Sequence, residues 1–226
     1  MNLADIDYNL PEHFIAQVPM EPRDAARLLV CVNGEVEHKK VSDITDFLQA
    51  GDVLVVNETR VLPSRLSLVR STGGRVEVLL LEPLQEDDSE WEALIRPGRK
   101  MRAGEILATA TGDSFAEVLG RSSAGDTFRI RLCVGATSGE RRAAIEAVGS
   151  LPLPPYITTT LEDLERYQTV YAHEAKSSAA PTAGLHFTAA LLEEIEKMGV
   201  AIAKVELVVG LDTFKPVDEE NPLNHV

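Results

Sequence analysis

Residues 75–81 read Arg-Val-Glu-Val-Leu-Leu-Leu, so that apolar side chains first alternate with charged ones and then form a continuous run. Two later stretches show the same period of two, Trp91-Glu92-Ala93-Leu94-Ile95 and Phe128-Arg129-Ile130-Arg131-Leu132-Cys133. Turn sequences accompany them, namely Gly73-Gly74, Pro97-Gly98 and Gly112-Asp113. Short alternating strands at this spacing predict a small antiparallel barrel or sandwich. We therefore expect an inserted antiparallel β-barrel domain over residues 66–149.

The sequence before this β region contains shorter structural signals. Asn33-Gly34 separates two short strand-like runs, Leu28–Val32 and Glu35–His38, which predicts a hairpin. Ser42 can cap a short helix that ends before Gly51, with Ile44, Phe47 and Leu48 on its apolar face. The continuous apolar run at 53–56 predicts a buried strand.

The sequence after the β region returns to helix and strand signals. A helix is expected over 140–148, and the prolines of 151–156 then lead the chain back to the first domain. Thr188 can cap a helix that runs through Met198, with Leu191, Leu192 and Ile195 facing inward and Gly199 ending it. Alternation over 203–209 predicts a strand. Residues 1–65 and 150–226 are thus expected to form an α/β, mixed α+β, host domain.

Composition and charge narrow the class of protein. The chain has 226 residues, 44% of them hydrophobic and 26% charged, as in ordinary globular domains. Its formal net charge of −14 has the wrong sign for non-specific coating of nucleic acid, so any RNA contact should be confined to a local basic face. Neither a membrane span nor a secretory signal is apparent, and Cys31 and Cys133 match no metal spacing. We expect a cytoplasmic protein without a metal centre or membrane contact.

The most informative stretch for chemistry is residues 179–188, Ala-Ala-Pro-Thr-Ala-Gly-Leu-His-Phe-Thr. Small residues let a ligand approach the backbone closely, and the helix that follows offers free N–H groups at its start. His186 could act as an acid, a base or a hydrogen-bond donor near neutral pH. The alternative is a tight loop that packs into a helix, with His186 satisfied in the core.

Two further segments carry polar groups suited to a nucleoside. Asn57, Thr59 and Arg60 follow the expected strand at 53–56 and could hydrogen-bond a ribose or a phosphate. Tyr167 and Gln168 could stack on and hydrogen-bond a base. An ordinary polar turn and a half-buried amphipathic segment are the respective alternatives.

A basic turn lies within the expected β domain. Four cations occupy seven residues around Pro97-Gly98, and they could meet RNA phosphates. A solvated hairpin tip is the alternative. The four are Arg96, Arg99, Lys100 and Arg102.

Taken in order, several stretches resemble the S-adenosylmethionine:tRNA ribosyltransferase-isomerase family of queuosine biosynthesis. Pro181-Thr182-Ala183-Gly184-Leu185-His186-Phe187 is the most specific of them. The resemblance spans nearly the whole chain, and its other stretches are 7–11 with 15–17, 22–29, 51–61, 151–157, 167–171 and 210–217.

The resemblance implies a hemibarrel-like host domain with an inserted β-barrel, and an enzyme of the transferase class. Such an enzyme transfers and isomerises the ribosyl moiety of S-adenosylmethionine onto 7-aminomethyl-7-deazaguanine at the tRNA wobble position, giving epoxyqueuosine-tRNA, adenine and methionine. It implies tRNA with a GUN anticodon as partner, a monomer, and no cofactor, since S-adenosylmethionine is a consumed substrate. On this basis His186 would transfer protons, and the substrate-binding residues would be Arg23, Asn57, Thr59, Arg60, Tyr167, Gln168, Pro181, Thr182, Gly184, Thr213 and Phe214.

The family continues beyond the position where this chain stops, so a C-terminally incomplete member is expected. Two alternatives stay open at this point. One is a non-catalytic, truncated or diverged RNA- or nucleotide-binding paralogue. The other is a different S-adenosylmethionine- or nucleoside-using enzyme on the same scaffold.

Overall fold

A computed structural model describes residues 2–208 except 6, 124, 160 and 162. The chain forms two compact units: Met1–Val61 with Leu153–Val226, and Leu62–Pro152. We call the first the host unit and the second the barrel unit. Within the described ranges, no helix is long and apolar enough to cross a membrane.

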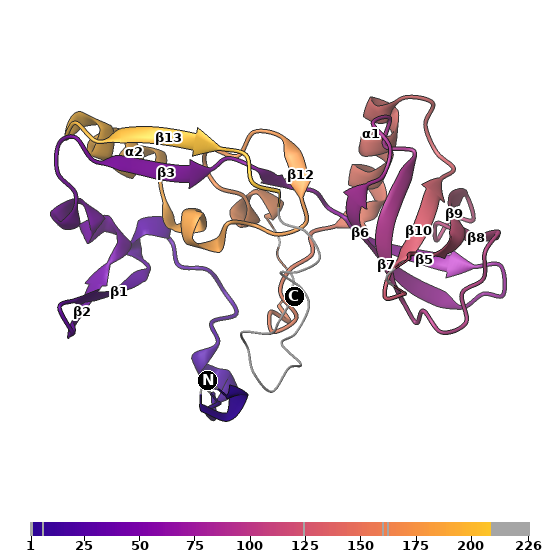
Figure 1. The fold of residues 1–226 in the computed structure, drawn as a ribbon, viewed down its shortest axis with the longest axis horizontal. Helices are drawn as coiled ribbons and strands as arrows, with labels where there is room; N and C mark the ends of the chain where they lie inside the picture. The colour runs from indigo at the N-terminus through magenta and orange to yellow at the C-terminus, as the bar shows by residue number, and fades with distance from the viewer. Residues whose placement is uncertain (1, 6, 124, 160, 162, 209–226) are drawn as a thin grey trace. The chain divides into compact units, whose positions relative to one another are not determined.

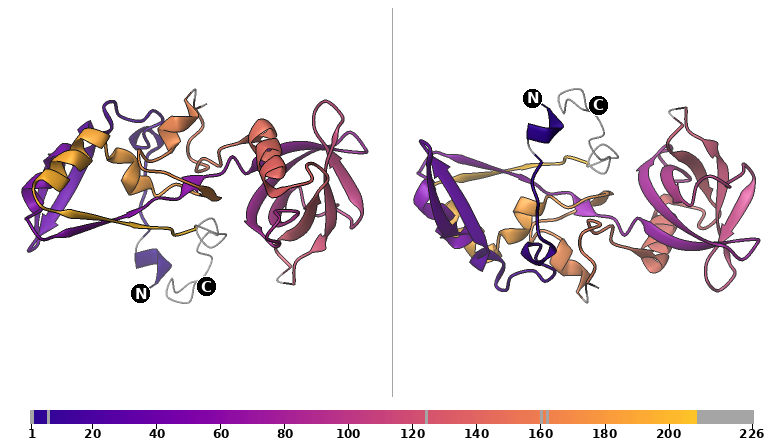
Figure 2. Two further views of the ribbon diagram at one scale, coloured as in Figure 1. Left: turned by 90° about the horizontal axis from the view of Figure 1, so that it is seen from above. Right: turned by 90° about the horizontal axis from the view of Figure 1, so that it is seen from below.

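The barrel unit is a closed antiparallel barrel of six strands (Figures 1 and 2). The strands pair in the order β5-β6-β7-β10-β9-β8, and β8 pairs again with β5 to close the barrel. The short strand β11 adds to β5. The bounds are β5 Arg65–Arg70, β6 Arg75–Pro83, β7 Glu90–Arg96, β8 Glu105–Ala108, β9 Ser114–Arg121, β10 Phe128–Leu132 and β11 Gly149–Ser150.

The alternation seen in the sequence is the alternation of the barrel wall. In β7 and β10 every second side chain is buried, among them Trp91, Phe128 and Ile130, while the charged residues between them face outward. The predicted mixed α+β class with an antiparallel β-barrel is therefore confirmed.

Helix α1, Ser138–Val148, packs against this barrel through the fully buried Ile145. It begins two residues earlier than the sequence indicates because Thr137 caps it: the Thr137 hydroxyl accepts from the Glu140 N–H at 3.3 Å. The Glu140 carboxylate in turn accepts from the Thr137 N–H at 3.1 Å. This reciprocal pair is a capping box.

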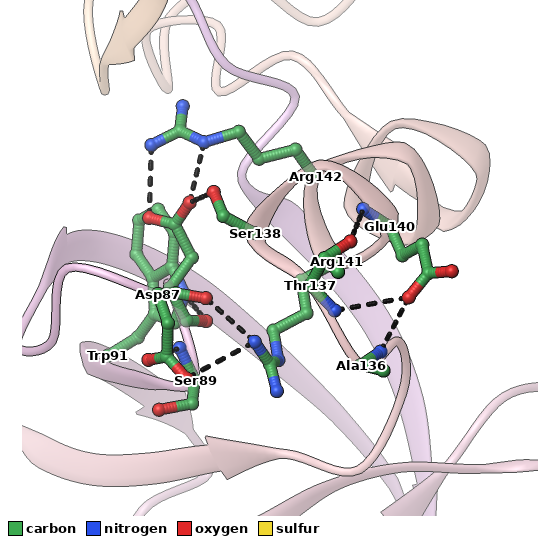
Figure 3. A network of polar contacts seen from close by, with 10 residues as sticks. Asp87, Ser89, Trp91, Ala136, Thr137, Ser138, Glu140, Arg141 and Arg142 are labelled. Carbon is green, nitrogen blue, oxygen red and sulfur yellow. Dashed lines mark hydrogen bonds and ion pairs between the residues drawn. The ribbon is translucent and has the colours of Figure 1, made fainter.

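A charged clasp fastens α1 to the turn between β6 and β7 (Figure 3). Arg142 donates from Nε to Oδ2 of Asp88 at 2.7 Å and from Nη2 to Oδ1 at 3.0 Å. Ser138 donates to the same carboxylate, and the Trp91 indole N–H donates to the Asp88 carbonyl at 2.9 Å. Because Asp88 is only 3% exposed, these partners offset the cost of burying its charge.

The host unit holds three two-stranded sheets within its described residues. Strands β1, Arg27–Val32, and β2, Glu35–Lys40, form the predicted hairpin, whose turn residues Asn33 and Gly34 both have positive φ, at 52° and 84°. Strand β3, Val53–Asn57, pairs in parallel with β13, Ala201–Val205. Strand β4, Arg60–Val61, pairs in parallel with β12, Ala175–Ser177.

The helical elements of this unit are mostly single turns of 3-10 helix. Helix α2, Ala189–Lys197, confirms the predicted helix: Thr188 caps it, Gly199 follows with φ of 88°, and Leu191 and Ile195 are buried. These two side chains form a core cluster with Ala26, Val41, Phe187 and Val200. The 3-10 turns are η1 Leu3–Asp5, η2 Glu12–Phe14, η3 Arg23–Ala25, η4 Val41–Phe47, η5 Leu164–Tyr167 and η6 Thr182–His186.

Three local predictions for the host unit were wrong. The segment after β2 is the 3-10 turn η4, capped by the Asp43 carboxylate on the Lys40 N–H at 2.8 Å and not by Ser42. The second strand of the β3–β13 pair begins at Ala201, earlier than expected, and the described residues after Val205 leave it. Strand β3 is not buried on both faces, since Val53 and Val55 are 59% and 61% exposed.

Candidate functional site

The end of strand β3 is held by the side-chain amide of Asn57. Its Oδ1 accepts from the Thr59 hydroxyl at 2.8 Å and from the Leu207 N–H at 3.1 Å. Its Nδ2 donates to the Leu207 carbonyl at 2.9 Å. Thr59 is only 2% exposed, and its single O–H is shared with that carbonyl, which lies 3.2 Å from the hydroxyl oxygen. The amide of Asn57 thus fixes residue 207 against the 57–59 turn.

Gln168 connects the second predicted segment to the first. Its Oε1 accepts from the Val61 N–H at 2.9 Å, and its Nε2 donates to the Val61 carbonyl at 3.0 Å. The side chain is 4% exposed. The Gln168 amide therefore forms with the Val61 backbone the two hydrogen bonds that a neighbouring strand could form, so both polar atoms of the amide are already occupied.

Arg60 makes a second connection between these segments. Its guanidinium forms an ion pair with Glu165 of η5, and its backbone N–H donates to the Glu174 carbonyl at 2.9 Å. About a third of the Arg60 side chain is exposed, at 32%. Arg60 is therefore open to solvent on one side of the site.

Two half-buried tyrosines reach the third segment. Burial raises the pKa of Tyr167, and a contact with the Ala180 backbone partly opposes that shift. Burial also raises the pKa of Tyr171. The Tyr171 hydroxyl lies against Gly184, where an added Cβ would stand 2.2 Å from it. Both hydroxyls stay protonated at neutral pH and can donate hydrogen bonds.

His186 is the last residue of η6 and is partly exposed. The described residues give it no hydrogen bond or ion pair of their own, so the imidazole is not satisfied in a core. Pro181 and Thr182 begin the same turn, and Thr182 is exposed. The arrangement can present one acid–base group beside a tight loop of small residues.

Arg23 joins the second and third segments. Its Nη1 donates to the carbonyls of Gln168 at 2.7 Å and Leu185 at 3.1 Å, and its Nη2 donates to the Glu165 carbonyl at 3.0 Å. Burial and the nearby Arg166 lower the pKa of Arg23, while Glu21, Asp163 and Glu165 oppose that shift. The three sequence-predicted segments, 56–61, 166–171 and 179–188, thus meet in one part of the host unit.

Several predicted residues lie elsewhere or outside the description. Four exposed cations lie at the end of β7 and on the β7–β8 connection of the barrel unit, namely Arg96, the last residue of β7, and Arg99, Lys100 and Arg102 on the connection. Thr213 and Phe214 lie outside the described residues. The individual ligand-binding roles of the predicted residues stay predictions.

Two other features bear on where a ligand could sit. A hollow of about 440 Å³ lies on the barrel, lined by β5, β6 and Ala110, and the predicted site residues do not line it. Residues 2–208, with their four gaps, contain no group of three or more His, Cys, Asp or Glu placed to hold a metal ion.

One residue of the site was missed by the sequence reasoning. The Asp24 carboxylate accepts from the Thr188 hydroxyl at 3.1 Å, beside His186. The sequence signal that could have identified Asp24 is its position directly after Arg23, a predicted site residue.

The fold and site together define an α+β protein in which an inserted closed barrel interrupts a unit that carries a histidine-bearing loop. A family model described as "Queuosine biosynthesis protein" matches residues 3–226, and the chain belongs to this family.

Relatives with known names agree with this membership. The chain is 48% identical over 228 residues to S-adenosylmethionine:tRNA ribosyltransferase-isomerase of Symbiobacterium thermophilum, and 47% identical over 227 residues to that of Carboxydothermus hydrogenoformans. Each comparison covers 100% of this chain and 65% of the relative, so the chain spans about two thirds of their length. A crystal structure of S-adenosylmethionine tRNA ribosyltransferase from Thermotoga maritima matches at 32% identity and a TM-score of 0.35, covering 91% of this chain and 58% of that one.

Proposed function

We propose that this chain takes part in transferring and isomerising the ribosyl moiety of S-adenosylmethionine onto 7-aminomethyl-7-deazaguanine at the tRNA wobble position. The products would be epoxyqueuosine-tRNA, adenine and methionine. The observation that carries the proposal is the 48% identity to a named ribosyltransferase-isomerase along the full length of this chain. We further propose that the acceptor is a tRNA with a GUN anticodon and that the protein acts as a cytoplasmic monomer.

The reaction asks little of any single side chain. The sulfonium of the donor acidifies the neighbouring ribose C5′ proton, so a modest base can remove it. Departure of adenine then needs a proton or electrostatic help, and the acceptor amine must lose a proton to attack. His186, partly exposed and unpaired within the described structure, is our candidate for proton transfer. Positioning of the donor supplies much of the remaining acceleration.

The contacts divide the other candidates into two groups. The polar side-chain atoms of Asn57, Thr59 and Gln168 already bind the protein's own chain, so these residues would shape the site. Arg60 and Thr182 are accessible and could contact ribose or the tRNA backbone. The close approach at Gly184 keeps the loop of small residues tight.

The activity is tested by the release of adenine. Mixing the chain with S-adenosylmethionine and a tRNA that carries the 7-aminomethyl-7-deazaguanine base should release adenine only when both are present. We expect His186→Ala to slow this release by about 100-fold or more, the usual effect of losing a proton-transfer group. Chromatography of the free base gives the rate.

Two outcomes separate the candidate functions, and a third tests the role of His186. Binding of the tRNA without any release of adenine would support the non-catalytic alternative. Release of adenine with some other acceptor would point to a different enzyme on this scaffold. Unchanged turnover in His186→Ala would remove His186 from the mechanism.

The basic turn of the barrel unit is our candidate contact for tRNA phosphates. Exposed cations bind phosphates largely through release of counterions, so their loss reduces the salt dependence of binding. We expect the double variant Arg99→Ala and Lys100→Ala to weaken tRNA binding and to reduce the slope of log K against log salt by about 1.5. Binding titrations at several salt concentrations provide the measurement.

A matched control removes the same charge from the host unit. Lys39→Ala with Lys197→Ala takes away two cations in surface ion pairs, with side chains 35% and 77% exposed. We expect the salt slope of this control to equal that of the wild type. Equal slopes in the two double variants would contradict an RNA contact at the 96–102 turn.

A further inference from the structure

Two adjacent side chains of η3 grip the chain on both sides of His186. Arg23 holds the Leu185 carbonyl, with Nη1 at 3.1 Å, directly before the histidine. Asp24 accepts from the Thr188 hydroxyl at 3.1 Å, two residues after it. The backbone that carries the imidazole is therefore fastened at both ends to the same short turn.

Three of the five N–H donors of the Arg23 guanidinium bind the protein's own carbonyls. Both hydrogens of Nη1 are used, on Gln168 and Leu185, and Nη2 donates to Glu165. The planar guanidinium fixes the directions of these donors, so the three carbonyls are held in one geometry.

Thr188 connects the Asp24 contact to the start of helix α2. Its hydroxyl donates to Asp24 and accepts from the Leu191 N–H at 3.1 Å, which caps helix α2. Helix α2 is anchored through the buried Leu191 and Ile195. Ala26, next in the chain to η3, belongs to the same core cluster as Phe187. Both ends of the grip therefore rest on packed core.

We propose that Arg23 and Asp24 form a clamp that positions His186, and that Arg23 does not bind substrate directly. In the kinetic readout this inference rests on the proposed function, because it gives His186 a role in proton transfer. Its structural content stands without that role, since the clamp fixes the chain on both sides of His186 whatever the imidazole does. Arg23 and Asp24 are positioning residues that act through His186.

Nuclear magnetic resonance of the full chain tests the structural content. The five histidines can be labelled, and the His186 signal assigned by its loss in His186→Gln. In Arg23→Ala we expect the His186 ring signal to shift or broaden. We also expect the exchange protection of the Phe187 amide, which donates to the Gly184 carbonyl at 3.2 Å, to fall about tenfold.

Two conservative variants and one control separate positioning from general destabilisation. Arg23→Lys should be intermediate, because an ammonium cannot reproduce the fixed geometry of three donors. Asp24→Asn keeps an oxygen acceptor and should resemble the wild type, whereas Asp24→Ala should not. Arg166→Ala removes a neighbouring guanidinium, which contacts Met20 and Glu21 but not η6, and should leave the His186 signal unchanged.

The remaining outcomes decide between the clamp and a direct contact of Arg23 with the substrate. If Arg23→Ala does not fold, the Asp24→Asn and Asp24→Ala pair carries the same comparison. An unchanged His186 signal in Arg23→Ala, together with lost binding of S-adenosylmethionine, would overturn the clamp in favour of direct contact.

If the wild type turns over, Arg23→Ala should lower kcat about tenfold with less than a threefold change in KM for the donor. If the wild type releases no adenine, the proposed function fails while the resonance test still decides the clamp.

Discussion

Gly149→Ala is expected to lower the free energy of unfolding of the barrel unit by at least about 3 kcal/mol, which is the upper end of the usual cost of overpacking a buried site. A Cβ at this position would stand 1.8 Å from the Pro63 carbonyl oxygen and 2.7 Å from that of Ile145. Both are backbone atoms, so rotating a side chain relieves neither contact. Gly149 ends α1 and begins β11, which pairs with β5, and accommodating the methyl would pull these two elements apart.

The same helix provides the control, and the chain provides its own probe. Gly139 lies in the first turn of α1 with nothing within 4 Å of its added Cβ, so Gly139→Ala should be neutral or stabilising by up to about 1 kcal/mol. Trp91 is the only tryptophan of the sequence, is 2% exposed and belongs to the barrel unit, whereas all four tyrosines belong to the host unit. Urea titration followed by tryptophan fluorescence thus reports the barrel unit. Equal midpoints for the two alanine variants would contradict the close approach at Gly149.

Local signals in the sequence were sufficient where one element decides its own structure. The period of two over 91–95 and 128–133 predicts barrel strands because every second side chain must enter one core. The Thr188 cap and Gly199 predict α2 because both ends of that helix are satisfied by neighbouring residues. Strand β3 was misjudged because an apolar run does not reveal how many neighbours a strand has.

The sequence identifies the segments of the site but not which of their polar atoms are available to a ligand. The motifs identify segments 56–61, 166–171 and 179–188, and the structure brings these segments together. Which polar atoms remain available depends on pairings such as that of Gln168 with Val61, 107 residues away in the sequence. An amide that can bind a base can bind the backbone equally well. Only the folded partners distinguish a shaping residue such as Gln168 from an accessible one such as Arg60.

The second large effect is expected at Gly184, where the loop that carries His186 passes over Tyr171. In Gly184→Ala the new Cβ would lie 2.2 Å from the Tyr171 hydroxyl oxygen and 3.1 Å from Cγ2 of Thr169. Tyr171 packs against the core cluster of the host unit, so moving its ring disturbs buried contacts. We expect a loss of stability of about 1–3 kcal/mol. A displaced η6 should slow the release of adenine by about 100-fold.

A double-mutant cycle isolates this contact. Tyr171→Phe removes the nearest atom and leaves the ring carbon Cζ at 3.4 Å, an ordinary contact distance, although Thr169 still crowds the methyl. Tyr171→Phe alone should change stability little, and combined with Gly184→Ala it should recover at least about 1 kcal/mol of the loss. Hydrogen exchange at the Phe187 amide, which bonds to the Gly184 carbonyl, reports the repair at η6 itself. Strictly additive effects would mean that the Tyr171 hydroxyl does not set the position of the loop, and the steric account of Gly184 would then be wrong.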